Sequence, residues 1–484
     1  MKRVTSLLLC AALAWPAPVA LRAQPAATPR PGRPTLPPPA GAPLAIDPSA
    51  DPLLRLSRQT GDLADFRALV AGAVARYPLI AEAEAQRAEA EAARTEARSL
   101  RYPTVDVNIG SQRVLAREFD NDPNNIDNIV ERSRRTQRTD AILNAEQVLF
   151  DFGATSRRIS AARSRLEAAA LGVDSAVDRV ALRAIGAWYE VHSYRALVGL
   201  TEAFAEGQAE TRAAIEQRIA QGVTASGDLA RVDSYQASAA SRLARFRRQL
   251  AGAETRFREF FGAPAPAGLA RAPAPPGPAL SAEAVRELAL RTPDVRAAEL
   301  VAQATRTEVR AVRAEQLPRV TAGLDAGRYG VFETERDYDI RARLGVRHRI
   351  SLGAGARTDQ ARARAEGAEA RARTAREEAL REAEIARADI ETLQRQLGAL
   401  EEAYLASRRS RDVLAERFRV ARGSLFDLIE AEDALFETAT AYLLALAELD
   451  TARYILLSRT GQLVTALDLP RPEPAPRPEW RLRP

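Results

Sequence analysis

Residues 417–461 read RFRVARGSLFDLIEAEDALFETATAYLLALAELDTARYILLSRTG and contain the clearest periodicity in the chain. Large apolar side chains recur there every seven residues, at Leu428, Leu435, Tyr442, Leu449 and Leu456. A strict seven-residue repeat favours a helix that supercoils against a partner helix. We therefore expect a long coiled-coil helix in this stretch, which the chain enters through a turn at Gly423.

Landmarks of this stretch also occur earlier in the chain. Three residues recur after a constant 199 positions: Arg218, Asp228 and Gly262 as Arg417, Asp427 and Gly461. Tyr77-Pro78 and Thr292-Pro293 each open a helical stretch that ends 25 residues later, at Pro103 and Pro318. A period of about 200 residues is too long for a solenoid unit, so it predicts a duplicated module that packs against its own copy.

Proline-free runs allow very long helices in both halves. No proline occurs between Asn124 and Ala263 or between Arg319 and Leu469. Helices from Ala154 to about Gln221 and from Ala356 to about Arg422 could each reach roughly 100 Å. We expect Gly222 and Gly423 to form the turns at the tips of two antiparallel helical hairpins.

Alternating segments of about ten residues lie between these helices. Val105, Val107 and Ile109 alternate with polar residues after Pro103, and a similar pattern begins at Val320. Four such segments suit the strands of a membrane barrel, although a small soluble antiparallel sheet would show the same alternation. Four strands cannot close a barrel alone, so the membrane interpretation requires an oligomer, and three copies would supply twelve strands.

Composition narrows the class of protein. Residues 1–23 have the charged start, apolar middle and small-residue end of a secretory signal peptide, and the single cysteine, Cys10, lies within them. No later run of about 18 apolar residues occurs, so we expect a periplasmic, secreted or β-barrel protein. The net charge of +6 is interleaved with acids and gives no support for nucleic-acid binding.

Proline-rich stretches divide the chain into similar repeats. Each repeat is expected to hold a helix, a β-hairpin at about 103–150 or 318–350, and a helical hairpin at about 154–262 or 356–461. The expected segments are a signal peptide (1–23), a lead-in (24–60), the first repeat (61–263), a linker (264–280), the second repeat (281–469) and a tail (470–484).

On these residues the chain resembles the TolC-type outer-membrane efflux and secretion channels. The resemblance covers nearly all of 61–469 and depends on the duplication, on the junctions at Tyr102-Pro103 and Leu317-Pro318, and on residues 148–153 and 417–461. It implies a mainly α fold with a small β part. A trimer would close a 12-stranded β-barrel in the outer membrane, above an α-barrel of helical hairpins in the periplasm.

The resemblance also implies a function and partners. The homotrimer would provide passive exit for substrates that arrive from an inner-membrane pump of the resistance-nodulation-division or ABC type. A periplasmic membrane-fusion adaptor would connect the two, in efflux or in type I secretion. A periplasmic coiled-coil adaptor is the alternative, but adaptors carry one hairpin and an inner-membrane anchor.

An acidic gate at the hairpin tips is implied as well. Asp427 and Glu430 match the family's acidic rings and lie three residues apart, on one helix face. Asp228 matches the tip aspartate of the first hairpin. In a trimer these residues would concentrate negative potential and favour cations. An acid in the first turn of a helix could instead serve only as a cap.

The tip departs from the family pattern at two positions. Phe418 and Gly423 stand where the family often has a tyrosine and an arginine that tie the closed gate to its neighbour. Phe418 lacks the hydroxyl, and Arg422 could replace the missing arginine from one position away. These departures put the family's closed-state hydrogen-bond network in doubt, and we expect the resting conductance to differ from the family's.

No catalytic, cofactor or metal site is expected. His192 and His348 have no partners at metal-ligand spacing, and the chain contains no nucleophile elbow or phosphate-binding loop. Trp188 and Tyr189 fall within a long helix and are expected in the core. A channel of this kind uses no energy of its own.

Overall fold

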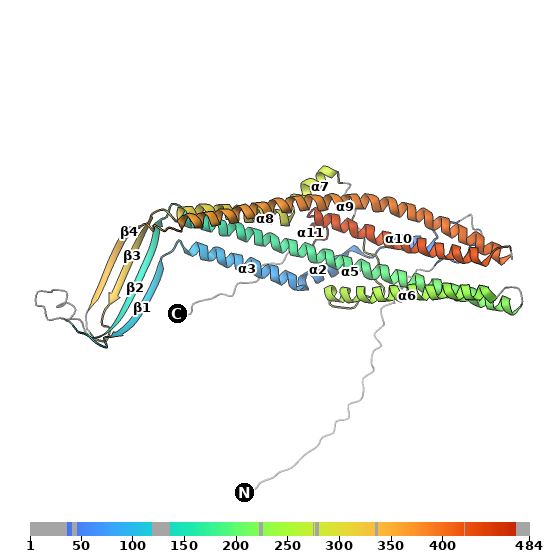
Figure 1. Cartoon of the computed structure of the whole chain (residues 1–484), viewed down its shortest axis with the longest axis horizontal. Helices are drawn as coiled ribbons and strands as arrows, with labels where there is room; N and C mark the ends of the chain where they lie inside the picture. The colour runs from blue at the N-terminus through green and yellow to red at the C-terminus, as the bar shows by residue number, and fades with distance from the viewer. Residues whose placement is uncertain are drawn as a thin grey trace, which may run out of the picture.

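A computed structural model describes residues 36–40, 46–118, 136–221, 226–273, 275, 280–333, 337–420 and 422–470. The molecule is elongated, with a four-stranded sheet at one end and two long helical hairpins that reach the other end (Figure 1). Within the described ranges, no helix is both long enough and apolar enough to cross a membrane. The expected signal peptide and residues 471–484 lie outside the described residues.

Both repeats contain the same five elements in the same order. The first repeat comprises α3 (Pro78–Ser99), β1 (Thr104–Arg113), β2 (Gln137–Phe150), α5 (Ala154–Ala220) and α6 (Ser226–Phe261). The second comprises α8 (Pro293–Ala314), β3 (Arg319–Arg328), β4 (Tyr338–Arg347), α9 (Ala354–Arg419) and α10 (Leu425–Arg459). Shorter helices are α1 (Pro52–Arg58), α2 (Leu63–Arg76), α7 (Ala282–Ala289) and α11 (Leu463–Ala466). The predicted mainly α fold with a small β part is confirmed.

Matching residues start and stop the helices of the two repeats. Pro78 and Pro293 occupy the first helical position of α3 and α8, where the fixed φ of proline suits a helix and its missing N–H costs nothing. Gly262 and Gly461 follow α6 and α10 with φ of 67° and 68°, the left-handed conformation that ends many helices. A side chain on Gly461 would lie 3.7 Å from the methyl group of Thr292, so the end of α10 lies against the start of α8.

The coiled-coil periodicity of α10 matches its packing. Leu428, Leu435, Tyr442, Leu449 and Leu456 are each at most 7% exposed. Helix α10 packs along α9 and also against α5, which joins the two hairpins. The heptad pattern therefore marks the buried seam of the predicted supercoil.

The largest core lies midway along the helical part. Trp188 and Tyr189, 7% and 2% exposed, lie in it as predicted. The Trp188 ring meets Phe66 of α2 edge-to-face at a centroid distance of 5.2 Å, and its indole N–H donates to the carbonyl of Ala270 at 3.0 Å. These contacts attach α2 and the linker between the repeats to α5.

The last residues of the proline-rich lead-in form a helix that the sequence did not predict. Residues 52–58 form α1, in which Leu53 and Leu54 are fully buried. The buried Asp51 carboxylate caps this helix, accepts a hydrogen bond from Tyr404 Oη at 3.0 Å and pairs with Arg408. A pairing of this kind compensates the cost of burying the charge. The proline-rich composition concealed a short apolar helix that docks on α9 and α10.

Candidate functional site: sheet faces and helical tips

The four strands form one antiparallel sheet in the order β1-β2-β3-β4. The register places Val105 opposite Ala145, Ala145 opposite Leu324, and Leu324 opposite Ala342, so rows of apolar residues cross the sheet on one face. Large side chains on this face are 38–75% exposed: Val105, Val107, Ile109, Leu143, Leu324, Ile340, Leu344 and Val346. A continuous exposed apolar surface of this kind marks a contact with lipid or protein.

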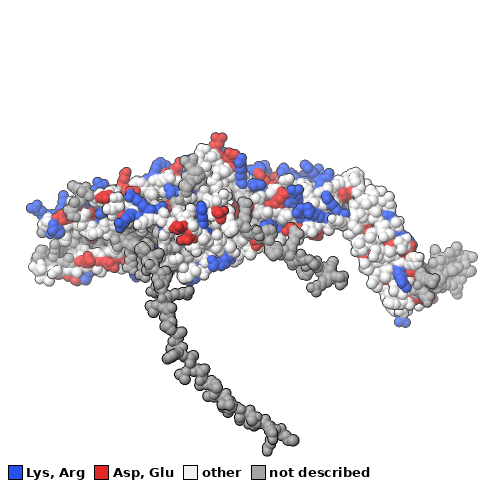
Figure 2. Space-filling view, turned by 180° about the vertical axis from the view of Figure 1, so that it is seen from behind, with Lys and Arg blue, Asp and Glu red and all other residues white. Residues whose placement is uncertain are grey.

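The opposite face of the sheet is polar. Arg343 Nε lies 2.5 Å from Asp325 Oδ2, and Arg347 Nη1 lies 3.5 Å from Glu146 Oε1. Figure 2 shows side chains of both signs over the helical part, whereas the sheet surface visible in that view is mostly uncharged. A sheet with one apolar and one charged face is typical of strands that separate lipid from water.

Strands β1 and β4 are the outer strands of the sheet. Each is paired with a single neighbour in this chain, β1 with β2 and β4 with β3. An edge strand offers unpaired N–H and C=O groups to another chain. The sheet is therefore open to extension on both sides.

At the helical tip, the turn between α9 and α10 closes around Gly423. A Cβ atom there would lie 2.9 Å from the backbone nitrogen of Phe418, closer than real Cβ atoms approach, and 3.1 Å from the carbonyl carbon of Arg417. The Arg422 N–H donates to the Arg417 carbonyl at 2.9 Å, which holds the turn against the end of α9. Only glycine fits this position without displacing the backbone.

Asp427 and Glu430 are both exposed in the first turns of α10. The cap of this helix is Ser424, whose hydroxyl oxygen accepts a hydrogen bond from the Phe426 N–H at 3.2 Å. In the part of the chain that the structure describes, neither carboxylate accepts a hydrogen bond or forms an ion pair. The capping role is therefore filled by a different residue, although Asp427 still interacts favourably with the helix dipole.

The two hairpins meet near their tips through apolar packing. Phe418 lies partly buried against the apolar cluster that forms this contact, so its ring contributes packing where a tyrosine would offer a hydroxyl. The guanidinium of Arg231 on α6 lies 4.2 Å from the ring centroid of Phe426 on α10, within range of a cation–π interaction. The buried members are Ile215, Val232, Leu425 and Ile429.

The tip of the first hairpin is described only in part. Helix α6 begins at Ser226, so Asp228 lies in its first turn. The side chain of Asp228 and the whole of Gly222 lie outside the described residues.

Sequence reasoning missed a partly buried acid two residues beyond Glu430. Glu432 Oε2 accepts a hydrogen bond at 3.1 Å from the amide of Gln208, which lies on α5 and is 1% exposed. Burial raises the pKa of Glu432 to about 7, with a smaller opposing effect from Arg411. Gln208 Oε1 has no hydrogen-bond partner among the described residues. Its position could have indicated this, because Glu432 lies four residues after Leu428 and therefore beside the buried seam of the coiled coil.

The described residues contain no group of three or more His, Cys, Asp or Glu that could hold a metal ion. His192 packs in the core, where its Nδ1 lies 3.3 Å from the carbonyl of Leu269 and burial lowers its pKa. His348 lies exposed just after β4.

A family model described as "Outer membrane efflux protein" matches residues 69–263 and 284–462, which fall one in each repeat. No curated protein matches the chain significantly in sequence.

Solved channel structures share the fold at low sequence identity. VceC of Vibrio cholerae is 17% identical with a TM-score of 0.72, over 82% of this chain and 96% of that one. CmeC of Campylobacter jejuni is 14% identical with a TM-score of 0.72, over 83% and 86%. MtrE of Neisseria gonorrhoeae, solved in an open state, is 19% identical with a TM-score of 0.66, over 82% and 89%.

Proposed function

Because the chain belongs to the outer membrane efflux protein family, we propose that three copies assemble into one duct through which solutes leave the cell. Proteins of this family are outer-membrane channels and not enzymes, so this chain is placed in the outer membrane. The family match includes both repeats, which disfavours the single-hairpin adaptor considered as the alternative.

The sheet is the observation that supports this proposal most strongly. Three copies of a four-stranded sheet, joined edge to edge through β1 and β4, would close a barrel of twelve strands. The exposed apolar face would then contact lipid, and the face carrying the Arg343–Asp325 pair would line a water-filled interior. The two helical hairpins of each chain would continue the wall into the periplasm.

The gate is proposed at the helical tips. Asp427 and Glu430 are exposed and unpaired in the described part of the chain, so three copies would present a ring of carboxylates to the same opening. Asp228 would add to this ring from the first turn of α6. Phe418 and Gly423 would hold the resting tip by packing and a tight turn, and Arg422 would provide a cation beside them.

A passive duct needs partners that deliver its substrates and supply the energy for export. A periplasmic membrane-fusion adaptor would dock near the hairpin tips. An inner-membrane pump of the resistance-nodulation-division or ABC type would supply the energy, for efflux or for type I secretion.

Conductance in a planar lipid bilayer tests the duct and the gate together. We expect discrete, cation-selective steps from the purified protein, with block by divalent cations. The double change Asp427→Asn, Glu430→Gln should raise the blocking concentration by about tenfold, because each lost carboxylate weakens the local potential. Glu366→Gln with Glu377→Gln removes the same charge from exposed positions on α9 and should leave block unchanged.

Three results would count against the proposal. Conductance without any effect of the tip change would retain the duct and reject the acidic gate. Equal effects of the tip change and the α9 change would indicate a general charge effect. A well-folded protein that neither forms trimers nor conducts would reject the duct.

A further inference from the structure

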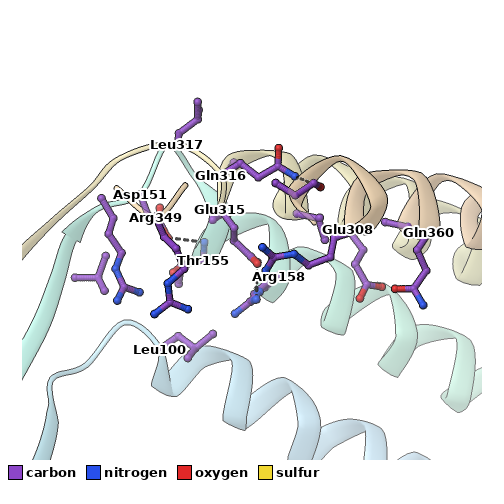
Figure 3. Close-up of a pocket in the computed structure, with 18 of the residues that line it drawn as sticks. Leu100, Asp151, Thr155, Arg158, Glu308, Glu315, Gln316, Leu317, Arg349 and Gln360 are labelled. Carbon is purple, nitrogen blue, oxygen red and sulfur yellow. Dashed lines mark hydrogen bonds and ion pairs between the residues drawn. The ribbon is translucent and has the colours of Figure 1, made fainter. Parts of the chain in front are cut away.

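A cavity of about 450 Å³ lies where the sheet meets the helical part, and we call it the junction cavity (Figure 3). The end of α8 and the starts of α5 and α9 form most of its wall. The strand residues that line it are Val148, Arg319 and Arg347, all on the polar face of the sheet. The cavity therefore opens on the charged side of the sheet and not on its apolar side.

Positive charge predominates in the lining. Three carboxylates, Asp151, Glu308 and Glu315, face six guanidinium groups. The arginines are Arg158, Arg319, Arg347, Arg349, Arg357 and Arg364. The excess of three positive charges is concentrated in one concave surface, which strengthens attraction for an anion.

The glutamates of the lining are already paired. Glu315 Oε1 lies 2.5 Å from Arg158 Nη2, and Glu308 pairs with Arg165 from outside the lining. On the strand side, Arg347 and Arg319 reach Glu146 only at 3.5 and 4.0 Å. The third carboxylate, Asp151, accepts hydrogen bonds from the backbone N–H groups of Gly153 and Thr155, so no carboxylate of the lining pairs with the remaining arginines.

Arg349, Arg357 and Arg364 are the unpaired members. None of the three has a carboxylate oxygen within 4.0 Å, counting only the residues that the structure describes. Arg349 lies in the connection after β4, and Arg357 and Arg364 lie in the first turns of α9. The planar guanidinium group binds two oxygens of a carboxylate or phosphate in a forked geometry that lysine cannot reproduce.

The two repeats differ at the corresponding helix starts. In the first repeat the Asp151 carboxylate accepts the Thr155 N–H at 2.7 Å and so places a negative charge at the start of α5. The matching residue of the second repeat is Ser351, and α9 has no acid in its first turn. Arg349 and Arg357 lie on either side of this start. The negative charge that the Asp151 side chain places at the start of α5 therefore has no counterpart at the start of α9.

We infer that the junction cavity binds an oxyanion, a phosphate, sulfate or carboxylate group, between Arg349, Arg357 and Arg364. The inference rests on the proposed duct for its orientation, because the polar face of the sheet lines the interior only in a closed barrel. The oxyanion then comes from a soluble solute inside the duct and not from a lipid headgroup. Three copies would place three such sites around the interior, so anionic solutes would be held briefly below the barrel.

Calorimetric titration of the full-length protein with inorganic pyrophosphate, at constant ionic strength, tests the site. Saturable binding is expected, and Arg349→Gln with Arg357→Gln should weaken it by at least about tenfold, the equivalent of about 1.4 kcal/mol. Arg371→Gln with Arg373→Gln removes the same charge from exposed positions farther along α9 and outside the cavity, and it should leave binding unchanged. Equal weakening by both pairs, or no saturable binding, would overturn the site.

Two further measurements keep the outcome unambiguous. Should the double variant not form trimers, Arg364→Gln alone replaces it and should also weaken binding, since Arg364 lies within a regular helix. In nanodiscs, pyrophosphate should bind equally well with phosphatidylcholine and with phosphatidylglycerol. Competition from phosphatidylglycerol would assign the arginines to a lipid headgroup and overturn the interior site.

Conductance separates this inference from the proposed function. Pyrophosphate binding without any conductance would leave the site and reject the duct. A conducting channel that does not bind pyrophosphate would leave the duct and reject the site.

Discussion

Helices α5 and α9 occupy matching places in the two repeats and have nearly equal lengths, 67 and 66 residues. The side chains that they bury are very different. Helix α5 buries large residues that include Val177, Ile185, Trp188, Leu197 and Leu200. Helix α9 buries mainly alanines, at positions 361, 365, 368, 372, 383 and 386. Helix α5 is therefore surrounded by other helices of its own chain. Helix α9 keeps a wide polar surface and packs against α8 through small side chains.

This difference predicts that α5 contributes more to the stability of the fold, whereas α9 contributes more of the exposed surface. Large buried side chains contribute most of the hydrophobic free energy of folding, so α5 should tolerate change poorly. An alanine seam contributes less per residue but lets two helices approach closely. We expect mutations to have their largest effects around α5 and small effects along exposed α9.

The largest expected effect is at Trp188. Trp188→Ala should destabilise the protein by about 3–5 kcal/mol, because it removes a buried ring and the hydrogen bond to the Ala270 carbonyl. Thermal unfolding followed by circular dichroism in detergent measures the change. The control is Leu444→Ala on exposed α10 surface, which should cost well under half as much. Similar losses for the two variants would contradict a core centred on α5.

A smaller effect is expected at the ion pair between the linker and α10. Arg271 Nη2 lies 2.8 Å from Asp450 Oδ1, and Asp450 is 0% exposed. Asp450→Asn should cost about 3 kcal/mol, because it leaves the Arg271 charge without its partner. Arg376→Gln breaks an exposed pair with Glu299 between α9 and α8 and should cost about 0.5 kcal/mol or less. Equal unfolding temperatures for the two variants would contradict the expected difference between the buried and the exposed ion pair.

The smallest expected effect depends on pH and arises where α10 meets α5. The folded pKa of Glu432 is raised from 4.5 to about 7, so the unfolded chain releases this proton first as the pH rises. The stabilisation is therefore complete below about pH 4.5 and is lost as the pH increases through about 7, by on the order of 1–3 kcal/mol. Unfolding temperatures measured from pH 4 to 8 should show this decline.

Glu432→Gln should flatten that part of the pH profile, since the new amide can pair with Gln208 without titrating. Glu430→Gln changes an exposed acid two residues away and should preserve the slope. A decline that persists in Glu432→Gln would mean that another group is responsible.

Local patterns predicted most of the fold. Proline-free runs and the heptads of α10 gave the hairpins, and the alternation around Val107 gave the strands, because both depend on neighbours in sequence. Helix α1 was missed, since its stability comes from Asp51 reaching Tyr404 and Arg408, more than 350 residues away. No local rule reports such a contact.

The candidate site was less accessible to sequence reasoning for the same reason. The need for glycine at position 423 is local and could be read from the turn. The partly buried state of Glu432 depends on contact with Gln208 of the other repeat, and the unpaired state of Arg349 depends on which acids the fold brings near it. Whether Asp427 and Glu430 form a ring depends on neighbouring chains, so their role stays a prediction.

The two open edges of the sheet have a consequence for how the protein is made. In the proposed trimer β1 of one chain pairs with β4 of another, and before that pairing each copy would expose two unsatisfied hydrogen-bonding edges and an apolar face. Such surfaces associate indiscriminately, and closure of the proposed trimer would need three edge pairings in the correct orientation. Closure of the barrel would therefore compete with aggregation while the protein is being made. Overproduction should favour aggregation, because the concentration of unassembled copies increases.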